Sequence, residues 1–195
     1  LANKGGGFEV LGNEAIQSIG EGKTSGLEFL FQQKLAKNFY GILAYTYFSS
    51  EFSGLDGILR PSVWDSRHLI SFSGGYKLRK NWEISARWRY AGKNPYVPVD
   101  INASTISYPE KIIDYETLGE FRLDAFNLAD IRIDKKWNFK NLSFNLYFEV
   151  QNFLAQPNPT PPVYGLIRNL DGNIIIPKNL VPLSNQEGNS SPLPT

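Results

Sequence analysis

The chain of 195 residues contains no cysteine and only one histidine, His68. The missing thiols exclude disulfide frameworks, thiolate metal sites and cysteine nucleophiles, and they leave the redox compartment open. One histidine is too few for most metal sites, and Asp65, Ser66 and His68 are too close in sequence to form a catalytic triad across a strand. We therefore expect His68 to belong to a polar cluster at the end of a strand, and we expect no enzyme activity, metal or cofactor.

Long apolar runs are also missing, since no stretch approaches the roughly 18 residues that a membrane-spanning helix requires. Their absence does not exclude a membrane, because the strands of a closed barrel pair with their neighbours and need only about 10 alternating residues each. The net charge of +1 gives no reason to expect nucleic acid as a partner. The chain begins at Leu1 without a signal segment, and we interpret it as a piece of a longer protein.

Alternation of apolar and polar residues, by contrast, is abundant. In the run 82–91, aromatic and aliphatic residues hold every second position, and charged or small residues mostly hold the positions between them. A period of two is typical of a strand with one apolar and one polar face. The same plan recurs across 25–153 and predicts six strands in three hairpins. Their tight turns fall at Lys37-Asn38, Lys80-Asn81 and Lys140-Asn141, where asparagine tolerates the left-handed backbone that short hairpins require.

The connections at the other end of these strands are long and unequal. They are the predicted loops 49–65 and 93–124 and the Pro-rich stretch 154–195, which we expect to be an extracellular loop with the final strand absent. Residues 1–24 are expected to be loop with a partial strand. Short turns on one rim and long loops on the other are typical of outer-membrane barrels. The predicted fold is therefore all-β: a fragment of about six meandering strands from an antiparallel up-and-down transmembrane β-barrel.

Aromatic residues on the apolar positions form two bands, as expected of a membrane girdle. The predicted girdle residues are Phe39, Tyr76, Trp82 and Trp137 beside the short turns, and Trp88 and Tyr90 nearer the long loops. A tilted strand of about 10 residues has a height close to the roughly 25 Å apolar band of such barrels. A soluble antiparallel sandwich or a lipocalin-like ligand-binding β domain, with the apolar face turned inward, remains an alternative.

Charged residues occupy the opposite, inward positions of neighbouring strands. The predicted lumen-facing polar network comprises Asp65, Arg67, Arg87, Arg89, Asp130, Arg132 and Asp134. These groups can form a structural ion network or line a ligand path. The long loops carry four amphipathic tyrosines of the type found at recognition surfaces, which can equally pack within their own loops. These ligand-loop candidates are Tyr96, Tyr108, Tyr115 and Tyr164.

Several ordered motifs carry a resemblance to a known family. They are Gly20-Glu21-Gly22-Lys23-Thr24-Ser25-Gly26-Leu27-Glu28, Trp64-Asp65-Ser66-Arg67-His68, Gly75-Tyr76, Trp82, Arg89-Tyr90-Ala91-Gly92-Lys93-Asn94-Pro95-Tyr96, Leu128-Ala129-Asp130-Ile131-Arg132-Ile133-Asp134-Lys135-Lys136 and Val150-Gln151-Asn152-Phe153. In this order and spacing they resemble the late barrel strands of TonB-dependent outer-membrane receptors of the Bacteroidetes-like type. The resemblance covers about residues 20–155.

The resemblance implies a 22-stranded barrel in the bacterial outer membrane, in which the six strands would be the sixteenth to the twenty-first. It implies four partners: outer-membrane lipid, an N-terminal plug domain of the same protein that lies outside this chain, a TonB-type energy-coupling protein that acts through the plug, and an imported ligand. That ligand could be a siderophore, a cobalamin-like cofactor, an oligosaccharide or a peptide. A passive porin or structural barrel is the main alternative, and a membrane enzyme is the weakest.

Overall fold

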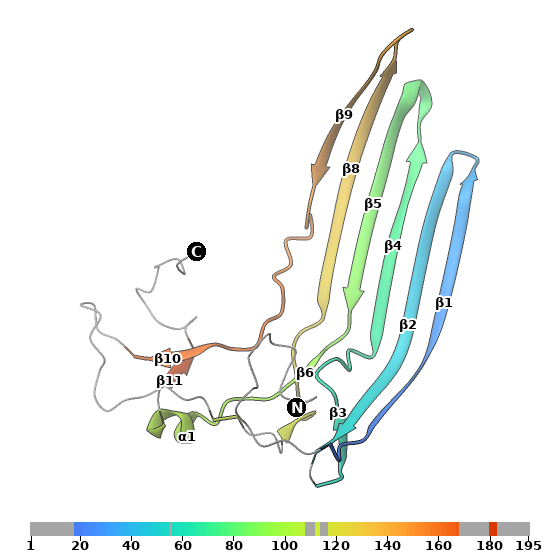
Figure 1. Ribbon diagram of the computed structural model, residues 1–195. Coiled ribbons are helices and arrows are strands. Elements are labelled where there is room, and N and C mark those ends of the chain that lie inside the picture. Colours follow the sequence, from blue (N-terminus) through green and yellow to red (C-terminus); the bar gives the residue numbers. More distant parts are fainter. Residues whose placement is uncertain (1–17, 55, 108–111, 114–116, 168–179, 183–195) are drawn as a thin grey trace.

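A computed structural model describes residues 18–54, 56–107, 112–113, 117–167 and 180–182 of the chain (Figure 1). Most of them form one antiparallel sheet, and the shorter elements lie at one end of it. The strands are β1 (Gly22–Ala36), β2 (Phe39–Ser53), β3 (Leu59–Pro61), β4 (His68–Lys77), β5 (Trp82–Ala91), β6 (Pro95–Tyr96), β7 (Phe121–Arg122), β8 (Phe126–Asn138), β9 (Ser143–Val150), β10 (Tyr164–Leu166) and β11 (Leu180–Pro182). The helical elements are η1 (Arg79–Asn81) and α1 (Ile101–Ile106).

The main sheet is an up-and-down meander. Its six long strands follow the order β1-β2-β4-β5-β8-β9, and every neighbouring pair is antiparallel. In Figure 1 the three tight turns lie together at the top and the long connections at the bottom. The predicted all-β up-and-down fold of about six meandering strands is confirmed. None of the helices in the described ranges is long and apolar enough to cross a membrane.

Two of the three tight turns have the predicted left-handed backbone. Lys37 and Asn38 have φ angles of 48° and 70°, and Lys80 and Asn81 have φ angles of 58° and 57°. In the two-residue connection 37–38, positive φ at both residues matches the twist of the flanking strands, and in the four-residue connection 78–81 it occurs at the last two residues. The first two hairpins are therefore closed by the turn chemistry that the Lys-Asn pairs indicate.

The third turn differs, and the prediction of left-handed backbone is wrong there. Neither Lys140 nor Asn141 is among the residues with positive φ. The strands end at Asn138 and Ser143, and the Phe139 N–H donates to the Leu142 carbonyl oxygen at 2.7 Å. The four-residue connection 139–142 closes the hairpin here without left-handed residues, although the connection 78–81 of the second hairpin has the same length.

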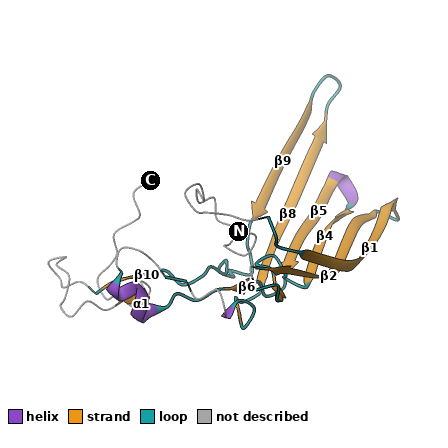
Figure 2. Cartoon of the chain, turned by 60° about the horizontal axis from the view of Figure 1, so that its bottom comes forward, coloured by secondary structure: helices purple, strands orange, loops and turns teal. Residues whose placement is uncertain are grey.

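The loop end is more ordered than the sequence indicates. The predicted loop 49–65 is wrong in part, because β2 extends to Ser53 and β3 pairs with its last residues. Within the predicted loop 93–124, β6 pairs with β7, and the Asp100 carboxylate caps α1 by accepting from the Ala103 N–H at 2.9 Å. In the Pro-rich stretch, β10 pairs with β11. Figure 2 shows α1 and β10 lying away from the strands of the main sheet.

The two faces of the sheet differ in chemistry, and neither is covered by a second layer of the described chain. Only Leu118, Ala129 and Leu166 are buried apolar side chains among the described residues. The face that carries Trp82 and Ile84, the apolar face, leaves large side chains exposed. Examples are Leu27 at 63%, Phe31 at 63%, Leu146 at 57% and Phe148 at 70%. A single-layer wall with an exposed apolar side matches a barrel in lipid better than a sandwich with a core.

Candidate functional site

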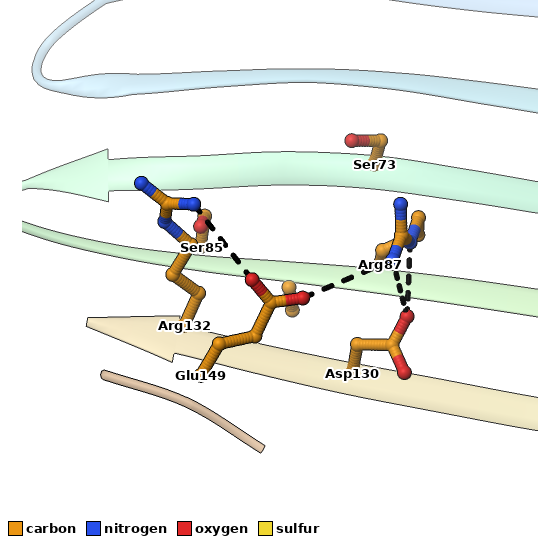
Figure 3. Close-up of a pocket in the computed structure, with 7 residues that line it drawn as sticks. Ser73, Ser85, Arg87, Asp130, Arg132 and Glu149 are labelled. Carbon is orange, nitrogen blue, oxygen red and sulfur yellow. Dashed lines mark hydrogen bonds and ion pairs between the residues drawn. The ribbon is translucent and has the colours of Figure 1, made fainter. Parts of the chain in front are cut away.

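The opposite side of the sheet, the polar face, carries a hollow lined by ionic residues from three strands. Strand register sets Arg87 of β5 opposite Asp130 of β8, and Arg132 of β8 opposite Glu149 of β9. Because directly opposed residues share a face, these four side chains converge (Figure 3). The hollow holds about 190 Å³. Its lining residues are Ser73, Ser85, Ala86, Arg87, Asp130, Arg132 and Glu149.

Asp130 is the most enclosed acid of this hollow, with an exposed fraction of 4%. Arg87 approaches its Oδ2 atom with Nη2 at 2.8 Å and Nε at 2.9 Å. Its other oxygen, Oδ1, accepts from the Asn152 N–H at 2.9 Å. Asp130 therefore fixes both the neighbouring strand and the chain that leaves β9.

Glu149 links the two arginines of the hollow. Its Oε1 atom lies 3.9 Å from Arg87 Nη2, and its Oε2 atom lies 3.7 Å from Arg132 Nη1 (Figure 3). The predicted network did not include this residue. The signal was present, because Glu149 alternates with Phe148 and Val150 and so belongs to the polar positions of its strand.

Arg132 makes its shortest ionic contacts along its own strand, in addition to the longer contact with Glu149 across strands. Its Nε and Nη2 atoms donate to the two carboxylate oxygens of Asp134 at 2.8 and 2.7 Å. Its guanidinium carbon lies 3.9 Å from the ring centroid of Tyr147, which is a stacking cation–π contact. Arg89 lies on the same face, opposite Ser71, and forms no ion pair within the described residues.

Asp65 and Arg67 do not join this network, contrary to the predicted grouping. Asp65 is fully buried at the loop end of the sheet, where its carboxylate accepts from Arg67 Nε at 2.9 Å, Arg122 Nη2 at 2.8 Å and the Ser50 N–H at 2.9 Å. Arg122 Nη1 also donates to the main-chain oxygens of Asp65 and Lys93 at 2.7 and 2.8 Å. We call these four residues, Ser50, Asp65, Arg67 and Arg122, the Asp65 clasp.

Ionisation of Asp65 is opposed by its burial and favoured by its donors. The hydrogen bonds from Arg122, the Ser50 N–H and Arg67 outweigh desolvation and hold the pKa of Asp65 below its ordinary value. The reciprocal contact with Asp65 raises the pKa of Arg67. Arg122 was missed by the sequence reasoning, since it follows Asp65 by 57 residues within an irregular loop.

Of the four ligand-loop candidates, the structure describes Tyr96 and Tyr164, and no contact between these two is found among the described residues. Tyr96 in β6 is half-buried, with its ring 6.2 Å from that of Phe121 in β7. Tyr164 is half-buried in β10. Tyr108 and Tyr115 lie outside the described residues.

The predicted girdle residues all lie on the apolar face. Phe39, Tyr76, Trp82 and Trp137 stand beside the tight turns, with exposed fractions between 37% and 46%. Trp88 and Tyr90 lie nearer the loops, with their rings 6.4 Å apart. Trp88 Nε1 donates to Asn127 Oδ1 at 2.7 Å, so its polar atom is satisfied without water. Contact of these rings with lipid stays a prediction.

His68 lies on the apolar face rather than in a polar cluster with Asp65. Its Nδ1 atom is 2.9 Å from the Tyr45 hydroxyl, and its ring lies against those of Tyr45 and Tyr47. Within the described ranges, no group of three or more His, Cys, Asp and Glu side chains could hold a metal ion.

A meandering sheet with one exposed apolar face and one ionic face is typical of the barrels of outer-membrane proteins. The chain belongs to the family described as TonB dependent receptor-like, beta-barrel, whose model matches residues 3–153. Members of this family are outer-membrane receptors. Searches of curated proteins and of solved structures returned no significant match.

Proposed function

We propose that this chain forms the late strands of an outer-membrane receptor that binds a scarce ligand outside the cell and imports it with energy from the inner membrane. The observation that carries the proposal is the segregation of the two faces within a sheet of this family. Placing the ionic face on the lipid side would cost about 2–4 kcal/mol for each arginine near mid-depth. The polar face therefore lines the lumen, and the apolar face with its aromatic rings contacts lipid.

The parts of the wall then have distinct roles. The ionic hollow around Asp130 lies where a plug domain of the same protein would contact the barrel wall. Charged groups that are half-exposed in this chain, such as Arg87 at 50%, offer donors to that plug or to a passing ligand. The Asp65 clasp holds the bases of the outer loops, and those loops, including Tyr96 and Tyr164, present the ligand-binding surface.

The orientation of the wall is tested with adjacent cysteine substitutions in the full-length protein. Ile84→Cys lies on the apolar face and Ser85→Cys lies beside it on the polar face. In isolated outer membranes, we expect a charged maleimide to label Ser85→Cys and a lipid-soluble maleimide to label Ile84→Cys. The reverse pattern would indicate a domain with its apolar face buried and would refute the proposed placement.

Import is tested in the source bacterium by comparing compounds removed from a defined medium. Three strains are compared: wild type, a strain without the receptor gene, and a strain without the inner-membrane energy transducer. We expect at least one compound to be depleted by the wild type and to persist with both deletion strains. Depletion that needs the receptor but not the transducer would favour a passive porin.

A further inference from the structure

Basic residues are concentrated at the tight-turn end of the sheet. The three segments that form this end, 32–41, 75–84 and 133–145, contain eight basic and two acidic residues, a net charge of +6 in a chain whose total is +1. The rest of the chain therefore carries −5. We call the eight basic residues the basic rim. They are Lys34, Lys37, Lys77, Arg79, Lys80, Lys135, Lys136 and Lys140.

The charge of the basic rim is not neutralised by its own acids. Glu83 accepts a hydrogen bond from the Tyr40 hydroxyl on the polar face, and the carboxylate of Asp134 accepts from Nε and Nη2 of Arg132. Seven of the eight rim side chains are exposed, and none of the eight forms an ion pair with a described residue. The rim therefore presents positive charges that no described carboxylate neutralises.

One member of the rim lies on the apolar face itself. Lys135 stands opposite Trp82 in the register of β5 and β8. Its Nζ atom lies 5.1 Å from the Trp82 ring centroid and 5.5 Å from that of Trp137, and it donates to the main-chain oxygen of Lys80. Two indole rings and one carbonyl oxygen thus hold an ammonium group at the border of the apolar surface, as a snorkelling lysine is held at a membrane interface.

Exposed apolar side chains lie among these cations. Leu35, Leu78, Phe139 and Leu142 have exposed fractions between 43% and 65% at the same end of the sheet. A soluble acidic partner would complement the charges but not these side chains. A lipid interface complements both, because phosphates attract the lysines and acyl chains accept the apolar groups.

We propose that the basic rim binds the phosphates of anionic phospholipids, with Lys135, flanked by Trp82 and Trp137, as the contact that faces the bilayer. The inference rests on the proposed placement of the wall in a membrane. The inference adds a preferred class of lipid, the anionic phospholipids, and a location, the leaflet on the side of the tight turns. Because the charges are exposed, the preference falls at high ionic strength.

The test uses the full-length receptor reconstituted in phosphatidylcholine vesicles. Brominated phosphatidylglycerol or brominated phosphatidylcholine is added in increasing amounts, and quenching of tryptophan emission is recorded. The relevant signal is the emission that disappears in the Trp82→Phe/Trp137→Phe variant. We expect brominated phosphatidylglycerol to quench at lower mole fraction, and we expect about 1 M salt to remove the difference.

Two double variants with the same charge change separate the rim from the rest of the surface. Lys135→Gln/Lys140→Gln removes two rim charges, and Lys23→Gln/Lys93→Gln removes two charges at the loop end. We expect the rim variant to lose its preference for phosphatidylglycerol by roughly fivefold per lysine, and the control variant to retain it. If the rim variant does not fold, Lys37→Gln/Lys140→Gln, with both changes in turns, provides the same comparison.

Equal quenching by the two lipids, or an equal loss of the phosphatidylglycerol preference in both double variants, would overturn the inference. Either result would indicate that the rim binds a protein or cell-wall partner instead. If neither brominated lipid quenches the emission, the membrane placement fails, and the inference fails with it. Failure of the rim alone is recognised by quenching that is strong but independent of the headgroup.

Discussion

The ring of Tyr40 on β2 covers Gly75 on the neighbouring strand β4, where a Cβ atom would lie 2.6 Å from the tyrosine hydroxyl oxygen. The hydroxyl group donates to Glu83 on β5, so one side chain spans three strands of the polar face. An aromatic ring over a cross-strand glycine shields exposed backbone and fixes strand register. The absence of a side chain at position 75 is therefore a structural requirement.

The substitution Gly75→Ala is expected to destabilise the protein by about 1–3 kcal/mol, because the new methyl group displaces the Tyr40 ring and crowds the Ile84 carbonyl oxygen. Urea unfolding of the full-length protein in lipid vesicles measures the change. Gly54→Ala is the matched control, since its Cβ would meet nothing closer than 3.7 Å. If Gly75→Ala costs as much in a Tyr40→Ala background, the covering ring is not the cause.

Asp65→Asn is expected to loosen the loop end without unfolding the strands. The substitution leaves Arg67 and Arg122 without their shared anion, and we expect about 2 kcal/mol of lost local stability, since both arginines are partly exposed. Hydrogen exchange of peptides from 49–67 and 121–124 should accelerate roughly 30-fold. The control Asp56→Asn removes an exposed pair with Arg60 and should change exchange far less. Equal acceleration in both variants would contradict the clasp.

The Asp65 clasp should resist pH change until strongly acidic conditions. Because its contacts depress the folded pKa of Asp65, its contribution to stability is fully present above the ordinary value of 3.8 and is lost as the pH falls through the lower folded value. Exchange at 49–67, corrected for intrinsic rates, should be constant from about pH 7 to pH 5 and rise only below about pH 4. Asp65→Asn should abolish that acid transition. A transition near neutral pH would assign the effect to another group.

Within the ionic hollow, Asp130→Ala should cost more stability than Glu149→Ala. Asp130 is nearly buried and anchors both Arg87 and the Asn152 N–H, so its loss should cost about 2–3 kcal/mol. Glu149 makes only long, partly exposed contacts, and its loss should cost less than about 1 kcal/mol. The midpoints of urea unfolding of the two full-length variants measure the two losses of stability. Equal midpoints would show that the burial of Asp130 does not make its loss more costly than that of Glu149.

Much of the sheet could be predicted because side-chain alternation has only two phases. Once Trp82 and Ile84 share a face, Arg87 must lie on the other face, and a shift by one residue would reverse the whole strand. The same reasoning places Asp130 beside Arg87 as soon as the two strands are neighbours. The two-residue period and the order of the strands therefore determine which face each side chain lies on, without knowledge of any loop.

The contacts made by loop residues could not be predicted in the same way. Arg122 meets Asp65 across 57 residues of chain with no periodicity to relate them. The partners of Glu149 depend on the register of β8 and β9, which the connection 139–142 sets, and that turn does not follow the left-handed rule. Arg132 bonds to Asp134 two positions along its own strand, a choice among nearby charges that only side-chain geometry decides.

The Asp65 clasp lies where the two ends of the loop 93–124 meet the main sheet. Arg122 donates to the Lys93 carbonyl oxygen, and the Leu123 N–H donates to the Asn94 carbonyl oxygen at 2.9 Å. The two ends of the loop 93–124 are therefore joined to each other as well as to Asp65. Segment 97–120 is thus an insert between fixed attachment points. We expect substitutions at exposed positions of 97–107 to leave the register of the strands unchanged, whereas Leu118, which is buried, and Gly119, where a Cβ atom would lie 2.8 Å from Pro61, are constrained by packing.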